Sequence, residues 1–271
     1  MAVKRILIAV KTYPTISKRY DELVCTAGFL ADGTWIRLYP IPFRKLDYIN
    51  QYKKYDWIEI DMEKNSRDFR PESYRPASKD TIIKVVGNIE TKNNWQERKQ
   101  IVLKNVYCNI SDLIKEAKDK NTQKSLAVFK PTKILDFLYE EVPREWDRGK
   151  LEALNQMKLF EKRDGDFKIV RKLPYKFSYK FEDNTGKARI LMIEDWETGA
   201  LFWNCIKKYN DEKIACQKVK EKYLDDFAVK KDLHFFLGTT QQYHHVYPNP
   251  FIIIGTFHPK LEEQNLFDNY V

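Results

Sequence analysis

The dipeptide Asp32-Gly33 constrains this chain most, because Asp-Gly between two apolar runs is a strong signal for a β-hairpin. It lies in the segment 20–44, which reads YDELVCTAGFLADGTWIRLYPIPFR. Both residues tolerate the positive φ of a type I′ turn, so we expect a two-residue loop in which Ala31 pairs with Thr34. Since side chains alternate between the faces of a strand, this register gives one core-facing set: Cys25, Ala27, Phe29, Ile36 and Leu38.

The other face of the expected hairpin carries Trp35, Arg37 and Tyr39 opposite the small residues Gly28 and Thr26. Large planar and cationic groups beside small ones form a shallow surface for a base or sugar, with Arg37 contacting a phosphate or a base edge. The alternative is that the two rings pack under a helix while Arg37 extends to water. A register shift of one residue would exchange the two faces.

The composition favours a folded protein with a polyanionic partner. The length of 271 residues is enough for one large or two medium domains, and the 43% hydrophobic and 14% aromatic residues favour a folded protein. Lys and Arg exceed Asp and Glu by 48 to 39, giving a net charge of +9 that favours nucleic acid, although lysine-rich composition also arises from genomic bias. No apolar run approaches the roughly 20 residues that span a membrane, and the start, MAVKRILIAVKTYP, lacks a small-residue cleavage site. We therefore expect a cytoplasmic protein with no membrane partner.

Metal and cofactor signatures are absent from the sequence. The four cysteines, Cys25, Cys108, Cys205 and Cys216, include no C-x-x-C pair, and the four histidines include no H-E-x-x-H. There is no G-x-x-x-x-G-K-[ST] loop and no G-x-G-x-x-G motif. The sequence thus predicts neither a bound metal nor a cofactor, unless the chain is a magnesium-dependent enzyme.

The order of apolar runs predicts an α+β fold. About seven strands and two helices are expected before residue 142, which favours a β-rich first half, barrel-like or a strongly curled mixed sheet. A β-hairpin, helices and a second β-hairpin are expected in the second half. Pro143 ends a strand and an amphipathic pattern over 146–160 follows, so we place a nucleic-acid-binding domain at 1–145 and an α+β domain at 146–271.

The segment 67–76, RDFRPESYRP, predicts an ordered basic loop in which Arg70 and Arg75 contact phosphate. Glu72 is either their salt-bridge partner or a carboxylate that faces the substrate. The alternative is a surface loop whose charges pair with one another. With Lys11, Tyr13 and Arg44, these arginines would surround the face formed by Trp35, Arg37 and Tyr39.

Three carboxylates, Glu194, Asp195 and Glu197, lie at an expected strand-to-helix junction. Asp195 there is a natural N-cap, and carboxylates in a first turn gain from the helix dipole. The functional alternative is that the three bind a magnesium-type ion for phosphodiester cleavage, which would also need a lysine on an adjacent strand. His244, in a polar loop between two apolar strands, is either a general base or an ordinary surface group.

Five blocks of the chain resemble a family of uncharacterised bacterial proteins over nearly its whole length. They are KTYPTISKRYDELVCTAGFLADGTWIRLYPIPFR, RPESYRP, IEDWETGALFW, FFLGTT and PNPFIIIGTFHP. No catalytic residue is carried over by this resemblance. It implies a setting among phage-defence or mobile-element genes, with protein partners in a defence-type complex.

Our main expectation is a protein that binds RNA, DNA or a modified base through Trp35, Arg37 and Tyr39. The first alternative is a metal-dependent nuclease or nucleotide hydrolase using Glu194, Asp195 and Glu197, with or without His244. The second alternative is a protein-interaction subunit of a larger assembly, whose basic charge reflects only genomic bias.

Overall fold

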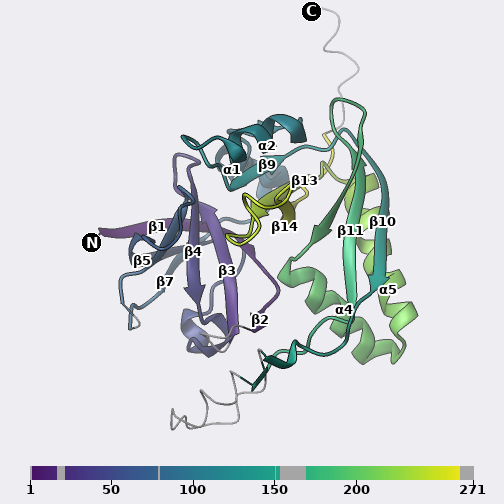
Figure 1. Ribbon diagram of the computed structural model, residues 1–271, viewed down its shortest axis with the longest axis horizontal. Coiled ribbons are helices and arrows are strands. Elements are labelled where there is room, and N and C mark those ends of the chain that lie inside the picture. The colour runs from purple at the N-terminus through teal and green to yellow at the C-terminus, as the bar shows by residue number, and fades with distance from the viewer. Residues whose placement is uncertain (1, 17–21, 79, 150, 153–168, 263–271) are drawn as a thin grey trace, which may run out of the picture.

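The computed structural model describes residues 2–16, 22–78, 80–149, 151–152 and 169–262 (Figure 1). It contains two seven-stranded sheets with helices at their edges and outer faces. The first sheet includes a closed barrel and the second is a curled mixed sheet, so the predicted α+β class is confirmed.

The barrel closes because its first strand pairs on both sides. In order around it lie β1 (Ala2–Lys11), β3 (Glu22–Phe29), β4 (Trp35–Ile41), β6 (Ser73–Pro76) and β5 (Asp56–Lys64). β5 then pairs with β1, β2 (Thr15–Ile16) adds to β3, and β7 (Lys84–Asn88) adds to β5. Alternate residues of β5 are buried, as its apolar and acidic alternation dictates. The interior holds an apolar cluster that includes Ile6, Ile8, Ile36, Leu38, Ile58 and Ile60.

The hairpin exists, but its expected register is wrong by one residue. Trp35 pairs with Phe29 and Arg37 with Ala27, because the loop has three residues, Ala31 to Gly33. The Leu30 amide donates to the Thr34 carbonyl at 2.9 Å, and only Gly33 in the loop has positive φ, at 85°. This is the other common hairpin solution, a turn followed by a left-handed glycine. The shift moves Trp35 and Arg37 to the same face as Phe29.

The second sheet begins earlier in the chain than the sequence indicated. Its strands, in spatial order, are β10 (Lys133–Glu141), β11 (Tyr175–Glu182), β12 (Ala188–Ile193), β14 (Phe251–Phe257), β13 (His234–Thr239), β9 (Leu126–Phe129) and β8 (Val106–Tyr107). The runs of β9 and β10 were expected among the strands of the first half, yet both pair here, together with β8, which was not expected as a strand. The change from one sheet to the other therefore falls near residue 105.

Helices connect and flank these strands. They are α1 (Lys92–Val102), α2 (Ile110–Lys118), α4 (Trp196–Tyr209) and α5 (Glu212–Lys220), with a π-helical segment at Glu221–Ala228 and short 3-10 turns at Phe43–Lys45 and Tyr48–Asn50. Asn109 caps α2, accepting from two backbone amides, and Asp195 caps α4 as expected. The helix expected over 146–160 lies mostly outside the described residues.

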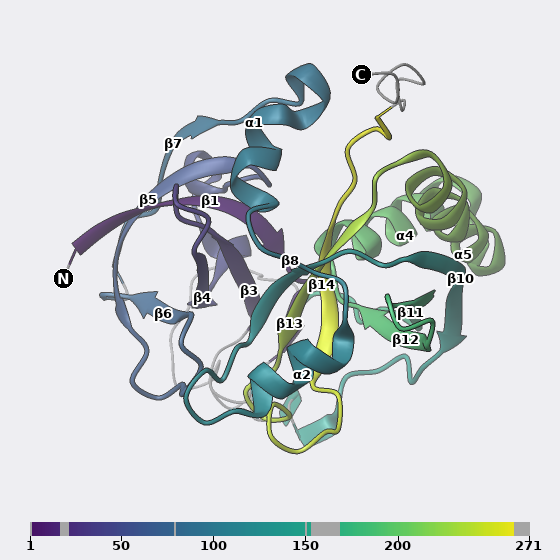
Figure 2. The ribbon, with the colours of Figure 1, turned by 90° about the horizontal axis from the view of Figure 1, so that it is seen from above.

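The two sheets share one apolar cluster. Figure 2 shows β13 and β14 between the barrel and the strands β10 to β12. Side chains of the barrel's outer face pack there against the second sheet: Leu7, Ala9, Val10 and Phe29 meet Leu126, Val128, Phe236, Ile254 and Phe257. Apolar packing thus joins the two sheets, so the side chains around any site at their junction are held in place.

Candidate functional site

The expected face of Trp35, Arg37 and Tyr39 does not face solvent as a unit. The Trp35 ring lies 3.9 Å from the Phe29 ring and 5.5 Å from the Phe236 ring, centroid to centroid. Arg37 is only 2% exposed, and its Nη2 donates to the Ser125 carbonyl at 3.1 Å. Tyr39 is half-buried. Because the register shift turns the first two side chains toward the second sheet, they belong to the junction of the sheets.

Arg70 of the basic loop donates its hydrogen bonds to other groups of the protein. It is buried and donates to the Asp68 carboxylate and to the Thr239 carbonyl. Glu72 accepts from the Ser125 amide and hydroxyl, at 3.1 and 2.7 Å. Arg75, on β6, pairs with Glu63 on β5. The alternative of internally paired charges describes this loop, which ties the barrel to the second sheet.

A different place collects cations and rings. It is a cavity of about 520 Å³ between the barrel and the second sheet, which we call the junction pocket. Five elements form it: the end of β1, the segment before β5, α1, the N-terminus of α4 and the end of β14. Its lining residues are Lys11, Lys53, Lys54, Tyr55, Trp95, Arg98, Trp196, Glu197, Ala200, Thr256 and His258.

Lys54 joins the two sheets at the floor of this pocket. Its Nζ lies 2.9 Å from Asp195 Oδ2 and 2.9 Å from Glu197 Oε2. The side chain of Lys54 is 7% exposed and that of Asp195 is fully buried. Burial opposes the charge of Lys54, but Asp195 and Glu197 outweigh it and raise the pKa of Lys54. Lys54 therefore stays protonated. The nuclease alternative called for a lysine on an adjacent strand, whereas Lys54 lies in the segment before β5.

Lys11, at the end of β1, is held differently. Its Nζ donates to the Tyr52 carbonyl at 3.2 Å and lies 4.4 Å from the Phe43 ring centroid and 5.3 Å from that of Trp196. It forms no ion pair within 4 Å among the described residues. Burial, followed by the charge of Lys54, lowers the pKa of Lys11 to about 8. The amine thus titrates close to neutral pH.

The pocket wall on the α1 side is built from stacked planar groups. The Arg98 guanidinium lies 3.8 Å from the Tyr55 ring centroid and 4.9 Å from that of Trp95, and it donates to the Ile89 carbonyl. Asn93, Asn94 and Trp95 all have positive φ, between 48° and 63°. Three successive left-handed residues are rare outside glycine, and the last of them, Trp95, lines the pocket.

His258 also lines the pocket, next to Trp95 of α1. Its ring stacks on that of Phe227 with centroids 3.7 Å apart, and the Trp95 ring lies 5.2 Å away. Burial, with the charge of Lys54 second, lowers the pKa of His258 to about 4. The ring is therefore neutral at physiological pH and contributes a flat apolar surface with a polar edge.

The other predicted residues lie elsewhere or serve the fold. The Tyr13 hydroxyl donates to the Arg171 carbonyl and accepts from the Trp203 indole, both at 2.8 Å. Arg44 is half-buried in the Phe43–Lys45 turn. Glu194 is partly buried, and burial raises its pKa. His244 is buried, with Nε2 donating to the Ala117 carbonyl at 2.8 Å and Nδ1 2.7 Å from the Thr239 hydroxyl, so it is no solvent-facing base.

Sequence reasoning missed nine of the eleven lining residues, among them the charged and aromatic groups Lys53, Lys54, Tyr55, Trp95, Arg98, Trp196 and His258. They come from four separate elements, and no spacing along the chain links them. One local signal existed, since Trp196 directly follows the capping Asp195 and so had to lie at the start of α4. Of the predicted residues, the structure brings Lys11, Asp195 and Glu197 together here.

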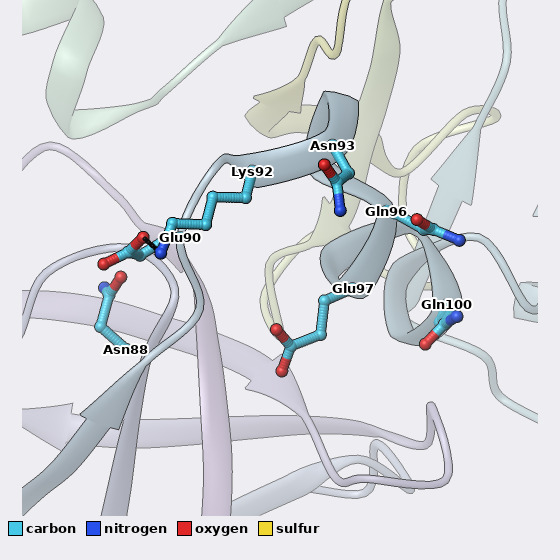
Figure 3. A pocket seen from close by; sticks show the side chains of 7 residues that line it. All are labelled: Asn88, Glu90, Lys92, Asn93, Gln96, Glu97 and Gln100. Carbon is cyan, nitrogen blue, oxygen red and sulfur yellow. Dashed lines mark ion pairs between the residues drawn. The ribbon is translucent and has the colours of Figure 1, made fainter.

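A second hollow, of about 510 Å³, lies between the end of β7 and α1 (Figure 3). It is lined by Asn88, Glu90, Lys92, Asn93, Gln96, Glu97 and Gln100, and Lys92 pairs with Glu90. Its side chains are uniformly polar and include no aromatic ring. The junction pocket, with four cations and three large rings, is the more specific site.

Two general features bear on the site's chemistry. No group of three or more His, Cys, Asp or Glu side chains comes together as a possible metal site in the described part of the chain. Within the same residues, every helix is too short or too polar to cross a lipid bilayer.

Comparisons with known proteins give a family but no activity. No curated protein matches the chain. One solved structure, described as "Structure of murine DNA binding protein bound with ds DNA", is similar over 97% of this chain and 98% of that chain, with 9% sequence identity and a TM-score of 0.31. A similarity this weak carries no argument about fold or ligand.

Residues 2–104 match the "Domain of unknown function (DUF8758)" and residues 106–271 the "Domain of unknown function (DUF8757)", a division that coincides with the change of sheet. With these two matches covering nearly its whole length, the chain belongs to the DUF8757 family, preceded by a DUF8758 domain.

Proposed function

We propose that this protein binds nucleic acid and holds one nucleotide unit in the junction pocket. One observation carries the proposal: Lys11, Lys53 and Arg98 line the same cavity as the rings of Tyr55, Trp95 and Trp196. Bases stack on aromatic side chains and phosphates seek cations, so a site with both matches both parts of a nucleotide. The size fits as well, because pockets for small ligands span roughly 300–1,000 Å³.

The balance of charge in the pocket supports an anionic ligand. Asp195 and Glu197 are both used by Lys54. Lys11, Lys53 and Arg98 form no ion pair with a described carboxylate, so their charges are available to a phosphate. Their field also adds to that of a chain with net charge +9, which favours encounter with polyanions.

The proposal is tested by fluorescence anisotropy with labelled single-stranded DNA, double-stranded DNA and RNA at two salt concentrations. We expect binding that weakens as salt rises, because phosphate contacts release counterions. Replacing exposed Lys53 by Ala should reduce the slope of log Kd against log salt by about 1. Arg75→Ala is the matched control, since Arg75 is also exposed but pairs with Glu63 outside the pocket. Absence of binding to all three nucleic acids would reject the proposal.

A second candidate rests on Lys54 Nζ lying 2.9 Å from both Asp195 and Glu197. Two carboxylates and a lysine are the groups that a magnesium-dependent phosphodiesterase requires. Against this candidate, the Lys54 amine already pairs with the carboxylate oxygens that would coordinate the ion. Running the binding reactions with and without magnesium on a gel separates the two, since only the nuclease yields fragments.

The cellular setting is part of the same proposal. A phage-defence or mobile-element system, in which protein partners assemble with this chain, would use a nucleic-acid-binding subunit. Intact nucleic acid and no salt-sensitive binding would favour the remaining alternative, a subunit that contacts only proteins.

A further inference from the structure

An exposed group of rings lies where β13 ends and β14 begins, whereas the junction pocket includes the other end of β14. Phe69 of the basic loop is 41% exposed, and three residues of the β13–β14 loop, Tyr243, Val246 and Tyr247, are 37%, 68% and 50% exposed. With exposed His245, we call these five side chains the ring patch. Figure 2 shows the β13–β14 loop beside α2, while α1, which lines the junction pocket, lies on the far side of these strands.

The rings of the patch are arranged in two stacked pairs. The Phe69 and His245 rings have centroids 4.8 Å apart and planes 28° from parallel, and the Tyr243 and Tyr247 rings have centroids 4.7 Å apart and planes 17° from parallel. Each pair uses one face of each ring, and much of the remaining ring surface reaches water. Contiguous exposed apolar surface of this kind marks an interaction site.

Hydrogen bonds hold the β13–β14 loop in shape. His244 is buried, and its Nε2 donates to the Ala117 carbonyl of α2 at 2.8 Å. Lys118 Nζ donates to the carbonyls of His244 and Tyr247 at 2.8 and 2.7 Å, and the Tyr247 amide donates to the Tyr243 carbonyl at 3.1 Å. Because the loop is already ordered, a ligand pays less conformational entropy on binding to it.

The charges around the patch match an anionic ligand. Lys64, Arg67 and Lys118 form no ion pair within 4 Å among the residues that the structure describes. The carboxylates of the basic loop make their contacts inside the protein, Asp68 with an arginine and Glu72 with a serine. The β13–β14 loop contains neither Asp nor Glu. Cations without a carboxylate partner therefore flank the exposed rings.

We propose that the ring patch is a second nucleic-acid contact, on which unpaired bases of a single strand stack. It goes beyond the proposed function, because it shares with that function only the class of ligand and uses no residue of the junction pocket. Bases stack on aromatic side chains whatever their sequence, while nearby cations neutralise the phosphates. Paired bases keep their faces inside the duplex, so the patch favours single strands. A protein partner is the weaker fit, because Val246 is the one aliphatic member of the patch and its neighbouring cations need an anion.

The test is photocrosslinking of the full chain to a single-stranded oligonucleotide that carries 5-iodouracil, with attachment mapped to single residues by tandem mass spectrometry. We expect attachment to the rings of the patch at least tenfold above that to Tyr48, an exposed ring outside both sites. Unlabelled single strand should suppress this attachment at concentrations at least fivefold lower than a duplex of the same sequence. A duplex that competes equally well would overturn the inference.

Matched variants test the stacking. Tyr247→Leu keeps an apolar side chain but removes a ring, so attachment to the other rings of the patch should fall at least fivefold. Tyr247→Phe restores the ring and should restore the attachment. Tyr139→Leu, which removes an exposed ring from β10, should leave it unchanged. Equal attachment in Tyr247→Leu and Tyr139→Leu would contradict stacking on the patch.

The pattern of attachment in the wild type separates this inference from the proposed function, whether or not any variant folds. Attachment at the patch and at Trp95 or Trp196 supports both. If attachment is confined to the two tryptophans, the inference fails while the proposed function stands. If it is confined to the patch, the junction pocket loses its ligand and the inference stands. Attachment at neither site overturns the inference, and a dimer in light scattering that Tyr247→Leu dissociates would then assign the patch to a second copy of this chain.

Discussion

At the scale of single residues, the junction pocket depends on one buried ion pair. Lys54 comes from the segment before β5 and Asp195 from the cap of α4, so their contact joins the barrel to the second sheet. Both side chains are almost inaccessible to water. A buried pair adds little net stability as a pair, but removing one member leaves an uncompensated charge.

We predict that Lys54→Met lowers the free energy of unfolding by about 3–5 kcal/mol, since Asp195 would remain buried without its partner. Urea denaturation measures the change. As a control, Lys176→Ala removes an exposed partner of Glu140 and should cost about 0–1 kcal/mol. Equal losses of unfolding free energy in the two variants would show that the contact between Lys54 and Asp195 does not hold the two sheets together.

His258 gives a pH dependence with a definite sign. Its folded-state pKa of about 4 lies below the ordinary value of 6.5, because of burial and then the charge of Lys54. Between these values the unfolded chain binds a proton that the folded chain does not. The contribution of His258 to stability is therefore present above pH 6.5 and lost as the pH falls towards 4.

We expect the wild type to lose up to about 3 kcal/mol more than His258→Phe between pH 6.5 and 4. Phenylalanine keeps the stacking on Phe227 but does not titrate. Thermal or urea unfolding at several pH values gives the two curves. Parallel curves would contradict a buried, neutral His258.

At the scale of elements, the sequence predicts strands well and their register poorly. β5 was identifiable from its apolar and acidic alternation, and β1, β13 and β14 from continuous apolar runs, because both patterns report burial directly. The hairpin register was not, since Asp-Gly serves both a two-residue turn and a three-residue loop with glycine last.

The three-residue loop predicts a strict need for glycine at one position. Gly33 has φ of 85°, and a Cβ there would lie 2.8 Å from the Lys104 side chain and 3.1 Å from the Ile101 carbonyl. Gly33→Ala should cost about 1–3 kcal/mol in urea denaturation. Gly87→Ala, with its nearest neighbour 4.0 Å from the added Cβ, should cost less. If Gly33→Ala proves as mild as this control, the loop geometry is wrong.

At the scale of the whole molecule, the pocket could not have been found from sequence. It exists only where the barrel meets the second sheet, and its residues are up to 247 positions apart, from Lys11 to His258. The same junction buries Arg37, which a hairpin considered alone leaves facing water. The class of ligand that we propose does follow from the sequence, because the net charge and the mixture of rings and cations do not depend on the packing.

Burial of Arg37 predicts that it does not contribute to ligand affinity. Its Nε and Nη1 have no partner among the described residues, so the guanidinium is poorly compensated. Replacing such a charge by an apolar side chain of similar length is often neutral or stabilising. Arg37→Met should therefore change the Kd for nucleic acid less than twofold while the protein remains folded. A large loss of affinity would restore Arg37 to the binding surface.

Binding of nucleic acid in the junction pocket is tested most directly by comparing Kd values at one salt concentration. The proteins compared are the wild type, Trp196→Ala and Tyr139→Ala. Trp196 lines the pocket, whereas Tyr139 is an exposed ring on β10. Stacking on an aromatic side chain is worth about 1–3 kcal/mol per base, so we predict that Trp196→Ala raises Kd roughly 5- to 150-fold and that Tyr139→Ala leaves it unchanged. Equal affinity of all three folded proteins would contradict the account.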